Sequence, residues 1–103
     1  MYIVNTTFVV EPHCRQQWIS LMENEYMPLL RQSGMGAATL CRIISERAEE
    51  HLTYALMVEV ESMADYSRLT GELFDRYLEL AGLLFGQRPL SVTTLLKKEL
   101  EQS

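Results

Sequence analysis

The run YIVNTTFVV at residues 2–10 contains no charged residue, Gly or Pro and is dominated by β-branched and aromatic side chains. Such a run predicts a strand that is buried on both faces. A strand of this kind belongs at the centre of a sheet, so its neighbours must come from later in the chain.

Residues 12–33 are predicted to form a helix. Pro12 fits the first turn, where its missing N–H would be unpaired in any case, and Gly34 is placed to end the helix in a left-handed conformation. Pro28 predicts a bend that wraps the helix around a sheet; the alternative is that the freed carbonyl of Asn24 faces a ligand. The apolar stripe at helical spacing consists of Cys14, Trp18, Leu21, Met22, Leu29 and Leu30.

Residues 37–48 and 52–61 both have strand composition, and the polar residues 49–51 between them predict a β-hairpin. Ser62 followed by Asp65 resembles a capping box and predicts the start of a second helix. Pro89 is expected to end that helix, and residues 90–97 form a last strand. The stripe of the second helix consists of Tyr66, Leu69, Leu73, Tyr77, Leu80 and Leu84.

The resulting order, βαββαβ with short connections, predicts an α+β fold of the ferredoxin-like kind. Right-handed crossovers then give an antiparallel sheet of order 4-1-3-2 with two helices on one face. The 103 residues are expected to form one domain, residues 1–103, because the chain is too short for a second.

Alternation along the strands predicts an uncovered second sheet face that mixes apolar and polar side chains. An apolar patch of this size would be exposed to water in a monomer, and the stretch LELAGLLFG at residues 78–86 is apolar nearly all round. Both features predict a homodimer that packs sheet face to sheet face. The second face is assigned Ile3, Asn5, Thr7, Val9, Thr39, Cys41, Ile43, Thr53, Ala55, Met57 and Thr93.

Charge and hydropathy exclude several partners. Nine Lys and Arg residues against fourteen Asp and Glu give a net charge of −5, which disfavours nucleic acid and anionic membranes. The only lysines are Lys97 and Lys98, and Tyr54 falls on the helix-facing row, so an RNA-binding sheet is not expected. No uncharged run is long enough to span a membrane, and the first residues lack a basic region typical of a signal peptide. We expect a cytoplasmic protein.

Reactive side chains form no recognisable catalytic or metal-binding motif. Cys14 and Cys41 are expected to be free thiols, because one lies on a helix and the other on a strand. With His13 and His51 they match no zinc-binding spacing, so we predict no metal and no cofactor. Motifs for nucleotide binding or an activated serine are missing, and no residue is given a catalytic role.

Four residues remain as candidates for contact with a ligand. Trp18 is either a core anchor or the wall of a pocket between helix and sheet. Asn5 and Thr7 are polar residues on a central strand, and they need partners across a dimer, in water or on a ligand. Tyr26, together with Asn5 and Thr7, could polarise a carbonyl, but all three are weak bases at neutral pH.

Several segments resemble a bacterial family known as domain of unknown function 4286: IVNTTFVVEP, Trp18 followed by Tyr26-Met27-Pro28, Thr53-Tyr54-Ala55, and Phe85-Gly86 leading into SVTTLL. The resemblance runs the whole length and implies a ferredoxin-like subunit of a dimeric α/β barrel. That architecture is shared with small monooxygenases, chlorite-dismutase-like haem proteins and stress-response proteins. Relatives tend to carry His where this chain has Tyr26, a departure that argues against haem binding or proton relay at this position, and the family implies no functional residue.

Three classes of function compete. A non-catalytic dimeric module that binds a small apolar molecule or another protein ranks first. A cofactor-independent monooxygenase or isomerase of the dimeric-barrel kind ranks second. Such an enzyme needs a proton acceptor near its substrate, and this chain is expected to have no His on the sheet or in the middle of either helix. A purely structural or interaction protein is third. An open pocket lined by Asn5, Thr7 and Trp18 would favour ligand binding.

Overall fold

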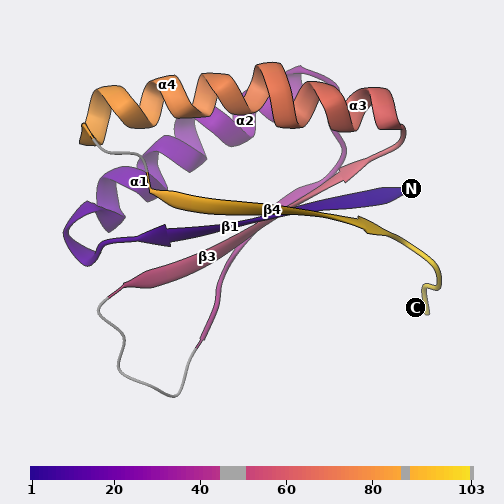
Figure 1. Ribbon diagram of the computed structural model, residues 1–103, viewed down its shortest axis with the longest axis horizontal. Coiled ribbons are helices and arrows are strands. Elements are labelled where there is room, and N and C mark those ends of the chain that lie inside the picture. The colour runs from indigo at the N-terminus through magenta and orange to yellow at the C-terminus, as the bar shows by residue number, and fades with distance from the viewer. Residues whose placement is uncertain (45–50, 87–88, 103) are drawn as a thin grey trace.

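The computed structural model describes residues 1–44, 51–86 and 89–102. Four antiparallel strands form one sheet, and helices form a second layer over it (Figure 1). The sheet order is β2-β3-β1-β4, which is 4-1-3-2 when counted from the other edge. This α+β arrangement is compatible with a ferredoxin-like fold. The strands are β1 (Tyr2–Val10), β2 (Ala38–Arg42), β3 (Leu52–Val60) and β4 (Leu90–Lys97).

Two helical arms lie side by side on the same face of the sheet (Figure 1). The first arm, residues 12–32, consists of a 3₁₀ turn η1 (Pro12–Cys14), α1 (Arg15–Leu21), a π-helical turn η2 (Met22–Tyr26) and α2 (Met27–Gln32). The second arm, residues 63–85, consists of α3 (Met63–Arg68), a π-helical turn η3 (Leu69–Leu73) and α4 (Phe74–Phe85).

The caps of both arms are formed by the residues that the sequence indicates. Gly34 has φ of +84°. Its N–H donates to the carbonyl of Arg31, and the N–H of Met35 donates to the carbonyl of Leu30, both at 3.1 Å. This pair of bonds is the Schellman arrangement, which requires a left-handed residue. At the second arm the Ser62 hydroxyl accepts a 3.1 Å hydrogen bond from the Asp65 N–H.

Several predicted boundaries and pairs are wrong. The strand predicted over residues 37–48 ends as β2 at Arg42. Its predicted end and most of the predicted hairpin turn fall at 45–50, outside the described residues. The second arm ends at Phe85, because Gly86 adopts a φ of +70° before Pro89 is reached. Glu72 and Arg76 lie four residues apart in the order that favours a surface ion pair on a helix, which predicts that they pair. In the structure Nη1 of Arg76 lies 3.0 Å from Oε2 of Glu79 instead.

Each arm buries side chains at intervals of four residues. Because an α-helix turns once per 3.6 residues, side chains four apart drift around it by about 40° per step. A π-helical turn closes a wider ring and takes up one extra residue, so one such turn in each arm keeps the stripe facing the sheet. Leu84, predicted to continue the second stripe, is therefore 51% exposed, whereas Ala81 is fully buried. The buried stripes are Trp18, Met22, Tyr26 and Leu30, and Leu69, Leu73, Tyr77 and Ala81.

The π-helical turn of the first arm comes directly before the segment that holds Pro28. At its end the N–H of Met27 donates to the carbonyl of Met22, a bond that spans five residues. Pro28 has no N–H and crowds the carbonyl four residues back, so a locally widened helix lets the arm continue through it.

The helix-facing side of the sheet has the composition that the alternation predicts. Val4, Phe8 and Val10 of β1 are buried, and so are the even-numbered residues of β3 from Tyr54 to Val60. Thr93 was expected on the opposite face, but it pairs with Thr6 in the register, and the two hydroxyl oxygens lie 3.1 Å apart. Alternate residues of the strand segment SVTTLL give Ser-Thr-Leu on one face and Val-Thr-Leu on the other, so the two faces have similar composition. Only the pairing with β1 therefore decides which Thr faces the helices.

Candidate functional site

Trp18 and Tyr26, two of the four candidate ligand contacts, lie in the core between the arms and the sheet. Trp18 is fully buried and Tyr26 is 2% exposed. The ring centroid of Trp18 lies 4.9 Å from that of Tyr54, and the Tyr26 ring lies 5.3 Å from the Tyr77 ring. The structure therefore places both residues within one aromatic cluster.

This core is closely packed. A cavity of about 30 Å³ lies beside Tyr26 and Thr6, which is room for about one water molecule. Burial, together with the nearby Tyr77 hydroxyl, raises the pKa of Tyr26 above its ordinary range. Burial also raises the pKa of Tyr77 to about 12, and the hydrogen bond from Trp18 partly offsets that rise. Both phenols stay protonated at neutral pH, so neither can accept a proton from a substrate.

Asn5 and Thr7 lie on the opposite face of the sheet. Both are half-buried on the central strand β1, and Asn5 has Met57 on one side and Thr94 on the other. In the part of the chain that the structure describes, no helix covers this face (Figure 1). The Asn5 Oδ1 atom is buried and has no hydrogen-bond partner among the described residues. The four candidate residues thus fall into two separate pairs. One pair lies beneath the helices and the other lies on the open face of the sheet.

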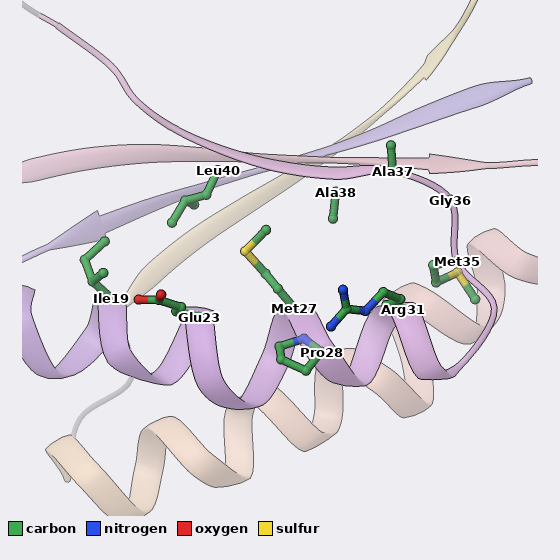
Figure 2. A pocket seen from close by; sticks show the side chains of 10 residues that line it. All are labelled: Ile19, Glu23, Met27, Pro28, Arg31, Met35, Gly36, Ala37, Ala38 and Leu40. Carbon is green, nitrogen blue, oxygen red and sulfur yellow. The ribbon is translucent and has the colours of Figure 1, made fainter.

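The sequence did not indicate a further groove, which has a volume of about 630 Å³. It lies between the first arm and the edge strand β2, and Figure 2 shows Met27 reaching up from the helix while Ala38 and Leu40 point down from the strand. Glu23 and Arg31 lie on either side of Met27. The lining consists of Ile19, Glu23, Met27, Pro28, Arg31, Met35, Gly36, Ala37, Ala38 and Leu40.

Two signals could have revealed this groove. Ile19, Glu23, Met27 and Arg31 recur every four residues, the same interval as the buried stripe, and they form a second row along the first arm. The segment 36–38 supplies only small residues opposite that row, so the helix and the strand leave space between them. The amphipathic pattern of the helix alone gives no indication of such a space, because the size of the space depends on how far from β2 the first arm packs.

A second pocket, of about 550 Å³, lies at the end of the sheet where β1 leads into the first arm. It brings His51 near the adjacent residues His13 and Cys14, from which His51 is distant in sequence. The Nδ1 atom of His13 lies 3.3 Å from Oε2 of Glu11, and both side chains are largely exposed. Among residues 1–44, 51–86 and 89–102, no three His, Cys, Asp or Glu side chains are grouped closely enough to hold a metal ion. Cys14 and Cys41 are free thiols.

The chain matches the family described as Domain of unknown function (DUF4286) over residues 1–99, and it belongs to that family. No curated protein matches it. Among the helices of the described residues, none has the length and apolar character needed to cross a membrane.

Proposed function

We propose that this protein is a non-catalytic homodimeric module of the dimeric α/β-barrel type, in which the open faces of two sheets pack together and enclose a small apolar ligand. The observation that carries the proposal is the open sheet face, where the buried amide oxygen of Asn5, without a partner in the described part of the chain, lies among half-buried apolar side chains.

The open face is apolar enough to favour association. Ile3, Val9 and Met57 are half-buried on the two central strands, and Val92 on the edge strand β4 is 70% exposed. Nine residues at about 3.3 Å each and four strands about 4.8 Å apart give a face of roughly 30 by 19 Å. Apolar burial would supply the driving force at roughly 25 cal/mol per Å².

Asn5 supports the same arrangement. A buried oxygen without a hydrogen bond costs about 1–3 kcal/mol, so its partner is expected to come from outside the chain. A two-fold interface brings the same patch of both copies together. The Asn5 amide of a second copy, or a polar group of an enclosed ligand, can then donate to Oδ1.

The polar groups near the centre of this face favour binding over catalysis. Asn5 and Thr7 offer an amide and a hydroxyl, which orient and polarise a bound carbonyl. Neither group accepts a proton readily at neutral pH, and a proton acceptor is what a cofactor-independent oxygenase or isomerase requires.

Light scattering of the wild-type protein and of two variants tests the dimer. Met57→Glu places a charge opposite Asn5 in the open face, whereas the control Met63→Glu adds the same charge at a site on α3 that is already 49% exposed. We expect a mass of twice 11.9 kDa for the wild type and the control, and a shift toward 11.9 kDa for Met57→Glu. A wild-type mass of 11.9 kDa at micromolar concentration would refute the dimer.

The ligand is tested separately by thermal shift with quinones, haem, flavins and fatty acids. A compound that raises the melting temperature of the wild type but not of Asn5→Ala supports binding at the open face. Stabilisation by none of them would leave a dimeric interaction protein. Turnover of any of them that is lost in Asn5→Ala would instead identify an enzyme.

A further inference from the structure

We propose that the groove between the first arm and β2 docks an extended peptide, which adds a fifth strand to the sheet along the free edge of β2. The peptide carries an apolar residue that enters the groove above Met27, flanked two positions away on each side by a basic and an acidic residue.

Among residues 1–44, 51–86 and 89–102, no strand pairs with the outer side of β2. The N–H of Ile43 donates to the carbonyl of Thr53, and the N–H of Glu59 donates to the carbonyl of Ala37, so the odd-numbered residues of this segment bond to β3. In an antiparallel pair the residues between them direct both N–H and C=O away from the partner strand. Ala38 and Leu40 therefore direct their backbone N–H and C=O groups to the outer edge, where β2 is the last strand of the sheet that the described residues form.

The groove lies where the side chains of an added strand would go. The side chains of Ala38 and Leu40 point toward the first arm (Figure 2). Alternate residues of a strand paired with β2 would point the same way, into the groove of about 630 Å³ above Met27 and Ile19. A free edge gives main-chain hydrogen bonds and a neighbouring apolar groove gives side-chain selectivity, which together define recognition by strand addition.

The charges along the arm specify the peptide. Glu23 and Arg31 flank Met27, and neither makes an ion pair with another described residue. Eight helical residues span about 12 Å, and a strand covers that distance in about four residues. Residues four apart in a strand point to the same side. A basic residue near Glu23, an apolar residue over Met27 and an acidic residue near Arg31 therefore fit one extended segment.

A second copy's β4 is a poorer occupant than such a peptide. The helix-facing row of β4 includes Thr93, Leu95 and Lys97, because Thr93 pairs with Thr6. In this row the apolar Leu95 has the cationic Lys97 on one side and the neutral Thr93 on the other. The row therefore offers no acidic side chain to pair with Arg31. Charge complementarity favours a segment from another protein.

Binding is tested with a fluorescently labelled, end-capped peptide whose core is Lys-Thr-Leu-Thr-Glu, by fluorescence anisotropy. Arg31→Glu should weaken binding about threefold to fivefold, the scale of an exposed ion pair. The same variant should recover affinity for a peptide with the core Lys-Thr-Leu-Thr-Lys. The control Arg76→Glu makes the same charge reversal at an exposed position on α4, outside the groove, and should bind like the wild type. Equal affinity of all variants for both peptides, or no binding at all, overturns the proposal.

Amide hydrogen exchange tests the backbone contacts directly. The N–H groups of Ala38 and Leu40 should exchange freely in the protein alone and become protected when the peptide is added. A peptide N-methylated at the central Leu, whose N–H faces β2 when its side chain enters the groove, should lose both the protection and the binding. Protection that rises with protein concentration in the absence of peptide would show that a second copy occupies the edge. Displacement of the peptide by a fatty acid that leaves both amides unprotected would identify a lipid site. Either result overturns the proposal.

Discussion

The indole Nε1 of Trp18 donates a 2.9 Å hydrogen bond to the hydroxyl of Tyr77, and this bond joins the two helical arms inside the core. Both side chains are fully buried, so each satisfies the polar group of the other where no solvent is available. The Tyr77 ring also packs 5.1 Å from the ring of Phe8 on β1. Trp18 and Tyr77 thereby fix the distance between the arms and their position over the sheet.

Tyr77→Phe should destabilise the protein by about 1–3 kcal/mol, because it leaves the buried indole N–H of Trp18 without an acceptor. Urea denaturation monitored by circular dichroism measures the change. Tyr66→Phe removes the hydroxyl of a half-buried tyrosine on α3 and should change stability by less than about 0.5 kcal/mol. Equal losses in the two variants would contradict the role given to the Trp18 bond.

Stability should fall in alkaline solution. Burial raises the pKa of Tyr77 from 10.0 to about 12 and raises that of Tyr26 as well. Above pH 10 the unfolded chain releases these protons while the folded protein keeps them, so the unfolded state gains in stability. The free energy of unfolding is expected to be unaffected by these groups below pH 10 and to decrease as pH rises from about 10 to 12. Denaturation at a series of pH values measures the slope, which Tyr77→Phe should reduce. An unchanged slope in that variant would contradict the assignment.

Gly36→Ala should destabilise the link between α2 and β2. A Cβ atom at this position would lie 2.8 Å from the backbone carbonyl oxygen of Glu59, which cannot move without disturbing the pairing of β2 with β3. Gly71→Ala is the matched control, because a Cβ there meets nothing within 4 Å and alanine favours a helix by about 0.5–1 kcal/mol. Thermal unfolding should give a lower melting temperature for Gly36→Ala and a higher one for Gly71→Ala. The opposite order would show that the close approach to Glu59 is relieved by relaxation.

Ser62→Ala should cost about 1 kcal/mol, because it removes the side-chain acceptor for the Asp65 N–H at the start of α3. Ser67→Ala makes the same substitution at an exposed position within the helix, where it should be neutral or slightly stabilising. Chemical denaturation of the two variants distinguishes the cap from a general effect of losing a hydroxyl. Indistinguishable midpoints would argue that the cap contributes nothing.

Local chemistry accounts for the elements that were predicted correctly. The uncharged run at 2–10 and the strand at 90–97 carry the composition of buried or paired strands, and their bounds agree with the structure. Gly34 and Ser62 cap the helices through bonds within a few residues of themselves. These strands and caps can therefore be predicted from neighbouring residues alone, without the rest of the fold. The end of the second arm was missed because Gly86 acts before Pro89, although both are helix-ending residues.

The sequence by itself determined the order of strands and helices, the helix caps and the row of each central strand that is buried, because these follow from side-chain periodicity and local hydrogen bonds. Tertiary structure decided the rest. The register of β4 against β1 placed Thr93 on the helix-facing side, and the sheet separated Asn5 and Thr7 from Trp18 and Tyr26. The groove beside β2 exists because the first arm packs at a distance from the small residues 36–38 and from β2, and that distance is set by the tertiary packing.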